Sequence, residues 1–137
     1  MTLVDTGPFV ALFDPQDHLH ARCRSVLQAI RGPLLTTVPV LTEAFHLLDP
    51  ASRGSDRVRD FIRAGGCDVF YLDDAGLLRA FALMWKYRDH PMGLADASVL
   101  VAAEALETRR VFTLDRNDFE TYRIKRGHQD QPVEIVG

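Results

Sequence analysis

Short apolar segments alternate along the chain with longer segments whose apolar residues recur at helical spacing. The short segments have the length and composition of buried β-strands. They lie at 2–5, 34–37, 67–72 and 111–114, and 132–136 fits a final edge strand. Helices are predicted over 8–13, 17–30, 39–49, 55–64, 75–88, 94–108 and 116–122.

Strands that alternate with helices predict an α/β fold, in which helices cover a mainly parallel sheet. In such a sheet, ligands gather outside the carboxyl ends of the strands. Asp5 ends the first predicted strand and Asp115 directly follows the strand at 111–114. This placement by itself brings two carboxylates to the edge where a binding site is expected.

Four acidic residues, Asp5, Glu43, Asp96 and Asp115, are embedded in or end apolar segments. Surface acids normally lie on polar faces, so acids in apolar segments need a reason. Two carboxylates about 4 Å apart repel by roughly 4 kcal/mol at an effective dielectric near 20. If the four converge, they require protons or a cation, and a hard divalent ion is the usual solution. The pattern therefore predicts a metal site.

Two of these acids also have a purely structural explanation. Asp5 is suited to cap a helix that starts near Pro8, and Asp115 is suited to cap the helix over 116–122. Asp118 would lie in the first turn of that helix, where the macrodipole favours a carboxylate. The sequence alone leaves both interpretations open.

Glu43 and Asp96 are harder to explain structurally. Glu43 lies at the border of the apolar face of its helix, beside Leu47. The helix around Asp96 is apolar almost all the way round, which implies burial on most sides. A buried carboxylate without a partner is costly, so Asp96 needs an arginine or a cation.

Hydroxyl and basic side chains are candidates for supporting roles. Thr6, Ser98 and Thr113 are candidate auxiliary hydroxyls, although ordinary structural roles explain Ser98 and Thr113 equally well. A basic cluster follows the fourth acid and is a candidate phosphate contact; its members are Arg116, Arg123, Lys125 and Arg126. The arginines between 53 and 63 fit a solvated helix face better than an RNA-binding strip. Trp85 is expected in the core, with stacking on a nucleotide as the alternative.

Length and composition limit the class of protein. The 137 residues suffice for one domain, 1–137, that buries a sizeable core without staples. Cys23 and Cys67 are far apart with no CxxC spacing, as expected of reduced thiols in a cytoplasmic protein. No targeting signal or membrane-spanning run is visible. The net charge of −3 argues against nucleic-acid binding through overall charge but permits a local basic rim.

Several common chemistries lack their motifs. The chain contains no GxGxxG, no Walker loop and no GxSxG elbow, which argues against dinucleotide, NTPase and serine-hydrolase sites. The five histidines show no HxxxH or HExxH spacing, so zinc chemistry is not expected.

The ordered acids and their flanks resemble those of the PIN-domain nucleases, and specifically of VapC-type toxins from bacterial toxin–antitoxin pairs. The resemblance covers nearly the whole chain. The matching segments are Leu3-Val4-Asp5-Thr6, Leu41-Thr42-Glu43, Leu94-Ala95-Asp96-Ala97-Ser98 and Thr113-Leu114-Asp115-Arg116-Asn117-Asp118-Phe119.

The resemblance implies a three-layer α/β/α sandwich and a Mg²⁺- or Mn²⁺-dependent endoribonuclease. It makes Asp5, Glu43, Asp96 and Asp115 the catalytic ligands of the ion, and Asp118 an auxiliary ligand or an alternative to Asp115. It further implies a homodimer, an RNA substrate and a cognate antitoxin protein that blocks the acidic cleft.

Two other functions remain compatible with the residues. A metal-dependent phosphatase or a receiver-like phosphoacceptor also uses acids at strand ends. However, Asp5-Thr6-Gly7 lacks the second aspartate of an aspartyl-phosphate enzyme, and Lys125 is poorly placed for a receiver. A catalytically silent RNA- or protein-binding module on the same scaffold is the other alternative, and four intact acids argue against it.

Overall fold

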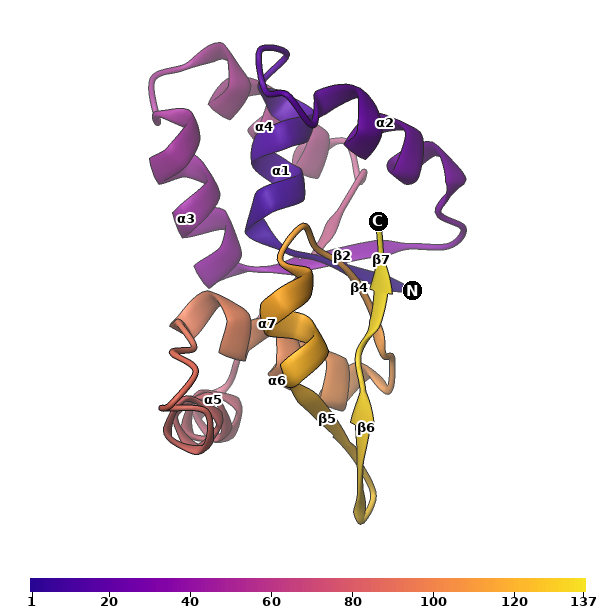
Figure 1. Ribbon diagram of the computed structural model, residues 1–137. Coiled ribbons are helices and arrows are strands. Elements are labelled where there is room, and N and C mark those ends of the chain that lie inside the picture. The colour runs from indigo at the N-terminus through magenta and orange to yellow at the C-terminus, as the bar shows by residue number, and fades with distance from the viewer.

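The computed structural model describes residues 1–137, and a five-stranded parallel sheet lies at its centre (Figure 1). The strand order is β3-β2-β1-β4-β7, and every neighbouring pair is parallel. The strands are β1 (Thr2–Val4), β2 (Leu34–Thr37), β3 (Asp68–Phe70), β4 (Arg110–Phe112) and β7 (Glu134–Val136). Because β1 is central, Leu3 pairs with Leu35 on one side and with Val111 on the other.

Helices cover both faces of the sheet and complete an α/β/α sandwich (Figure 1). On one face lie α1 (Thr6–Phe13), α2 (His20–Ala29), α3 (Val38–Leu48) and α4 (Arg53–Arg63). On the other face lie α5 (Asp74–Lys86), α6 (Leu94–Leu106) and α7 (Arg116–Thr121). None of these helices is both long and apolar enough to span a bilayer.

The first helices start directly at strand ends, and this connection positions the candidate acids. After β1 the chain passes through Asp5 and enters α1 at Thr6. After β2 it enters α3, where the Thr37 hydroxyl accepts the N–H of Val40 and Pro39 occupies the first turn. Proline is tolerated there because first-turn N–H groups have no partner within the helix. Short connections of this kind keep the amino ends of α1 and α3 at the carboxyl edge of the sheet.

The core is formed by both faces of the sheet and by α6. Leu3, Phe112 and Leu100 are fully buried, and α6 packs against β1 and β2. Alanines and other small residues fill α6, which allows the helix to lie close to the strands. Fully burying a large apolar side chain stabilises the fold by roughly 1.5–3 kcal/mol. The apolar character of α6 therefore reflects its central position, as its sequence pattern predicted.

The fold class and the parallel sheet confirm the sequence prediction, whereas three helix starts differ from it by two or more residues. α1 begins at Thr6 rather than at residue 8. α2 begins at His20 rather than at 17, because Asp17 forms a turn by accepting the N–H of Leu19 at 2.8 Å. α4 begins at Arg53 rather than at 55, because the Ser52 hydroxyl caps it by accepting the N–H of Ser55.

A β-hairpin between 123 and 132 was not predicted. It consists of β5 (Arg123–Arg126) and β6 (Gln129–Pro132), which pair antiparallel outside the main sheet. Charged and amide residues dominate both strands, so the segment has no alternating apolar pattern to detect. Gly127 in the turn has φ +63°, a conformation that glycine adopts readily. The edge strand predicted over 132–136 is present as β7.

Trp85 was wrongly predicted to pack in the core, since its side chain is 69% exposed. The guanidinium of Arg88 lies 4.3 Å from the centre of its ring. Leu78 and Phe81 on the same helix are also exposed. These three apolar residues follow one another at helical spacing and form a stripe on α5, which we call the α5 stripe.

Two further predictions, on the arginines of α4 and on the cysteines, agree with the structure. α4 is a solvated helix in which Arg59 pairs with Asp56 and Arg63 lies 3.9 Å from Asp60. Cys23 and Cys67 are both free and buried, as expected of reduced thiols.

Candidate active site

The four acids singled out in the sequence line one pocket at the carboxyl ends of β1 and β4. The pocket has a volume of about 400 Å³. It is lined by Asp5, Thr6, Gly7, Glu43, Leu47, Asp96, Leu114 and Asp115. These residues come from the β1–α1 junction, α3, α6 and the segment after β4, so four separate parts of the chain contribute one carboxylate each.

Asp5 is the most enclosed of the acids, with 6% of its surface exposed. It precedes α1, but its side chain makes no capping hydrogen bond, so the structural explanation as a cap is wrong. Instead, its Oδ2 accepts a hydrogen bond from the Thr113 hydroxyl at 2.8 Å. Burial raises the pKa of Asp5 to about 6, and the nearby charges of Glu43 and Asp115 act in the same direction. The hydrogen bonds to Asp5 oppose this rise without cancelling it.

Asp96 lies in the first turn of α6 and is the acid with the most strongly raised pKa. Burial raises the pKa to about 7, and the charge of Asp5 is the next cause. The carboxylate accepts a hydrogen bond from the Tyr122 hydroxyl at 3.2 Å. Burial also raises the pKa of Tyr122, and the charge of Asp96 raises it further. The phenol therefore keeps its proton and acts as the donor.

Asp115 and Asp118 differ in their surroundings. Asp115 caps α7 by accepting the N–H of Asp118 at 3.2 Å, so its structural explanation is correct, yet it also lines the pocket. The Asp118 carboxylate contacts Nε2 of His90 at 2.5 Å. Burial raises the pKa of Asp115, whereas hydrogen bonding to Asp115 and to His90 lowers that of Asp118. Asp118 is thus engaged beside the pocket, and Asp115 is the acid of this pair that faces it.

Glu43 projects from α3 and is exposed, in contrast to Asp5. Its Oε2 accepts a hydrogen bond from the Thr6 hydroxyl at 2.9 Å. A common pattern results, because Asp5, Glu43 and Asp96 each accept a hydrogen bond from a hydroxyl on another element. A bond to one carboxylate oxygen restricts rotation and leaves the second oxygen available to a ligand.

The three candidate hydroxyls separate into two groups. Thr6 and Thr113 contact acids of the pocket directly. Ser98 is fully buried, and its hydroxyl bonds the Thr37 hydroxyl and the Ala95 carbonyl, both at 2.6 Å. Ser98 therefore joins α6 to the end of β2, which is a structural role, and it is neither at the pocket nor on the helix surface.

The basic cluster after the fourth acid is largely engaged with backbone carbonyls. The Arg123 guanidinium donates to the carbonyls of three residues at the end of α7. Arg126 donates to the Glu107 carbonyl at 3.3 Å. Arg116 donates to the Gly137 carbonyl at 3.4 Å and stays half-exposed. Lys125 donates its backbone N–H to Glu104, and its side chain is exposed.

The donor set of the pocket suits a hard cation, although the acids do not form a compact ligand cluster. All candidate donors are carboxylate and hydroxyl oxygens, which Mg²⁺ and Mn²⁺ prefer. No three side chains among the histidines, cysteines, aspartates and glutamates converge closely enough to hold a metal ion between them. Mg²⁺ usually keeps several of its waters and uses only one or two carboxylates, so a spread set of acids is compatible with it.

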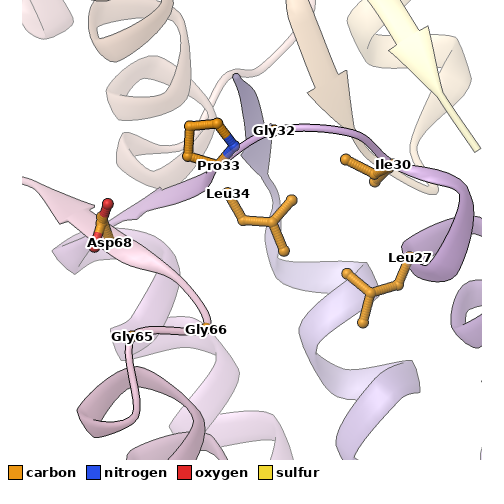
Figure 2. A pocket seen from close by; sticks show the side chains of 8 residues that line it. All are labelled: Leu27, Ile30, Gly32, Pro33, Leu34, Gly65, Gly66 and Asp68. Carbon is orange, nitrogen blue, oxygen red and sulfur yellow. The ribbon is translucent and has the colours of Figure 1, made fainter.

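A pocket at the opposite end of the sheet lacks comparable chemistry (Figure 2). It has a volume of about 250 Å³ and lies at the amino ends of β2 and β3. Asp68 is the one acid among its lining residues, which are otherwise apolar or glycine. The acid pocket is therefore the better candidate for an active site.

Two residues at the site were missed in the sequence. His90 lies in the loop between α5 and α6, and Tyr122 directly follows α7. Neither has a local pattern that distinguishes it, because both reach the acids through tertiary contacts. The position of Tyr122 one turn after Asp118 was the only available signal.

Comparison with known proteins places the chain in a family. The PIN domain family model matches residues 2–125, so the chain belongs to the PIN-domain family. It is 30% identical over 125 residues to Ribonuclease VapC26 of Mycobacterium tuberculosis, which covers 88% of this chain and 91% of that protein. Within the family, the chain is therefore of the VapC type.

Solved structures agree with this fold. VapC20 of Mycobacterium tuberculosis, described as a toxin that cleaves the sarcin-ricin loop, superposes with a TM-score of 0.75 at 17% identity. That match covers 85% of this chain and 92% of VapC20. A toxin–antitoxin complex from Klebsiella pneumoniae matches with a TM-score of 0.66 at 18% identity, covering 88% and 92%. At these identities the matches establish the α/β/α fold.

Proposed function

We propose that this protein is a Mg²⁺- or Mn²⁺-dependent endoribonuclease that acts as the toxin of a toxin–antitoxin pair. The observation that carries the proposal is the convergence of Asp5, Glu43, Asp96 and Asp115 on one pocket. Burial and mutual repulsion raise the pKa of Asp5 and Asp96 to about 6 and 7. A pocket that holds partly protonated acids near neutral pH gains from exchanging those protons for a cation. The names of the VapC relatives support an RNA substrate.

The proposal assigns a separate role to each residue of the pocket. Asp5, Asp96 and Asp115 would hold the principal ion, at most two of them directly and the rest through its water ligands. Glu43, which is exposed, would position a second ion or the attacking water. Asp118 is auxiliary, because its carboxylate is engaged by His90. A divalent ion bound there supplies an activated water and stabilises charge at the scissile phosphate. Thr6 and Thr113 keep Glu43 and Asp5 oriented toward the pocket.

The surroundings of the pocket suit a single RNA strand. A hollow of about 290 Å³ shares Glu43 with the acid pocket and is otherwise lined by Val38, Pro39, Thr42, Leu94 and Ala95. Its mainly apolar lining suits the face of a nucleobase whose phosphate lies at the acids. Arg116 and Lys125 are the two members of the basic cluster whose side chains are exposed, and the proposal assigns the phosphate contacts to them. Arg123 and Arg126 contribute positive potential while they hold backbone carbonyls.

Two protein partners belong to the same proposal. An antitoxin is supported by the matching toxin–antitoxin complex. A homodimer is supported by the α5 stripe of Leu78, Phe81 and Trp85, whose exposed fractions are 66%, 49% and 69%. A stripe of this kind on one helix can pair with its own copy about a two-fold axis, which is the commonest symmetry of soluble oligomers. The cytoplasm, where thiols stay reduced, is the compartment that suits the two free cysteines.

Cleavage of total bacterial RNA by purified, antitoxin-free protein tests the activity. We expect discrete fragments with Mg²⁺ or Mn²⁺ and none with EDTA. Asp96→Asn should abolish them, whereas Asp89→Asn, which alters an exposed carboxylate in the adjacent loop, should not. Full metal-dependent cleavage by Asp96→Asn would refute the assignment of the site.

A catalytically silent RNA- or protein-binding module is the second candidate. It is favoured by one observation, the lack of three ligand side chains close enough to hold an ion. Such a module should show no change in thermal stability when Mn²⁺ is added, whereas ion binding to the folded state stabilises it by mass action. Intact RNA together with an unchanged melting temperature would favour this candidate.

A further inference from the structure

The Tyr122 hydroxyl is the point where a buried aromatic cluster meets the acid pocket. Tyr122 is fully buried directly after α7. Its ring packs edge-on against Tyr87, Phe119 and His90, at centroid distances of 5.1, 5.3 and 6.0 Å. Its backbone N–H donates to the Asp118 carbonyl at 3.1 Å. Both the ring and the backbone are therefore held in place, so the hydroxyl is a fixed donor.

This fixed donor connects two acids that lie on different elements. The hydroxyl donates to Oδ2 of Asp96, at the start of α6, while the Tyr122 backbone belongs to the end of α7. α7 begins at the Asp115 cap, which lines the same pocket. The contact between Tyr122 and Asp96 thus ties the start of α6 to the helix that begins at Asp115.

We propose that Tyr122 is a positioning residue that holds one oxygen of Asp96 in place and leaves the other, Oδ1, for the ligand of the pocket. This inference rests on the proposed function, because it takes the ligand to be a divalent ion. A carboxylate whose orientation is already fixed loses less conformational freedom when it binds, and preorganisation of this kind increases affinity. Tyr122 itself does not touch the ion or the RNA.

Tyr87 provides a matched control. Its ring belongs to the same cluster, and its hydroxyl also makes one hydrogen bond, by accepting the backbone N–H of Arg123 at 3.0 Å. That bond does not involve an acid of the pocket. Tyr122→Phe and Tyr87→Phe therefore both remove one hydrogen-bonded hydroxyl and keep the aromatic ring, and only the first frees the Asp96 carboxylate.

The first test measures Mn²⁺ affinity in the absence of RNA, by electron paramagnetic resonance of the free ion. We expect Tyr122→Phe to weaken Mn²⁺ binding by about tenfold, the effect typical of losing a hydrogen bond to a charged group. Tyr87→Phe should bind as the wild type does. Because the loss is in ion binding, saturating Mn²⁺ should restore most of the kcat of Tyr122→Phe for RNA cleavage.

The outcomes separate this inference from the proposed function. Equal Mn²⁺ affinities of the two variants, together with an active wild type, would overturn the role of Tyr122 alone. A wild type that binds no Mn²⁺ would overturn the role of Tyr122 together with the metal-dependent function. A crystal structure of the Mn²⁺-loaded wild type is a second test that needs no variant. The hydrogen bond from Tyr122 to Asp96 should persist in it, and a broken bond would overturn the inference.

Discussion

Asp96→Asn should stabilise the metal-free protein at high pH even though it removes a candidate ligand. The pKa of Asp96 is raised from its ordinary value of 3.8 to about 7, mainly by burial and then by the charge of Asp5. A carboxyl whose pKa is higher in the folded state than in the unfolded state favours folding most when it is protonated. That contribution is complete below about pH 4 and is lost as the pH rises toward 7. Asparagine keeps the shape of the side chain and never acquires the charge.

The expected gain in the free energy of unfolding follows from the difference between the ordinary pKa of Asp96 and its pKa in the folded protein. The pKa of Asp96 rises by roughly three units, and one unit corresponds to about 1.4 kcal/mol. The charged Asp96 therefore lowers the free energy of unfolding at pH 8 by up to about 4 kcal/mol. Part of this repulsion is shared with Asp5, whose pKa is raised to about 6. We expect Asp96→Asn to gain about 2–4 kcal/mol at pH 8 and almost nothing at pH 4.

Urea unfolding in EDTA at pH 4, 6 and 8 measures this effect, with Asp89→Asn as the control for removing an exposed charge. The wild type should lose stability between pH 4 and 8, and the Asp96→Asn curve should be flatter. Saturating Mn²⁺ should reverse the order at pH 8, since only the wild type gains stability from the ion. A wild-type stability that is constant between pH 4 and 8 in EDTA would show that the raised pKa of Asp96 and Asp5 is wrong.

Four further predictions concern other parts of the molecule. Thr113→Val removes the hydroxyl that bonds Asp5, so the pKa of Asp5 should rise above 6 in a carbon-detected NMR titration, and an unchanged value would contradict the contact. Glu104→Gln should lower the free energy of unfolding by about 1–3 kcal/mol in urea, because this carboxylate accepts hydrogen bonds from Nε and Nη2 of Arg79 and from a backbone N–H of β5. If the proposed homodimer forms through the α5 stripe, Phe81→Glu in the middle of the stripe should yield a monomer by light scattering, and an intact dimer would place the interface elsewhere. Burial raises the pKa of the Cys67 thiol to about 12, so it should react with a disulfide reagent at pH 8 only as fast as the protein unfolds.

The fold was predictable from the sequence because its signals are local. Short apolar strands, and helices that start at prolines and capping residues, give the order of elements, and that order gives a parallel sheet. The hairpin over 123–132 was not predictable in the same way. It is held by pairing between its own strands, by the fully buried Ile124 and by the bond from the Lys125 N–H to Glu104. A single apolar residue leaves no apolar period in the sequence.

The acids of the pocket were predictable because an acidic residue within an apolar segment is unusual and can be recognised from the sequence alone. Their partners were not. The contact between Thr113 and Asp5 spans 108 positions, and the contact between Tyr122 and Asp96 spans 26. Trp85 was predicted to be buried and is exposed. The spacing of apolar residues along a helix is the same whether that face packs in the core or faces solvent, so the sequence does not distinguish the two.

The central position of β1 has a consequence for how the protein is made. β1 is synthesised well before β4, which begins at Arg110 and is one of its two neighbours in the sheet. Until that segment leaves the ribosome, Asp5 lacks Thr113 and Asp115, and Asp96 lacks Tyr122. An incomplete nascent chain therefore contains most of the acids but no assembled pocket. If the proposed function is correct, the incomplete chain cannot cleave RNA near the ribosome that is still synthesising it.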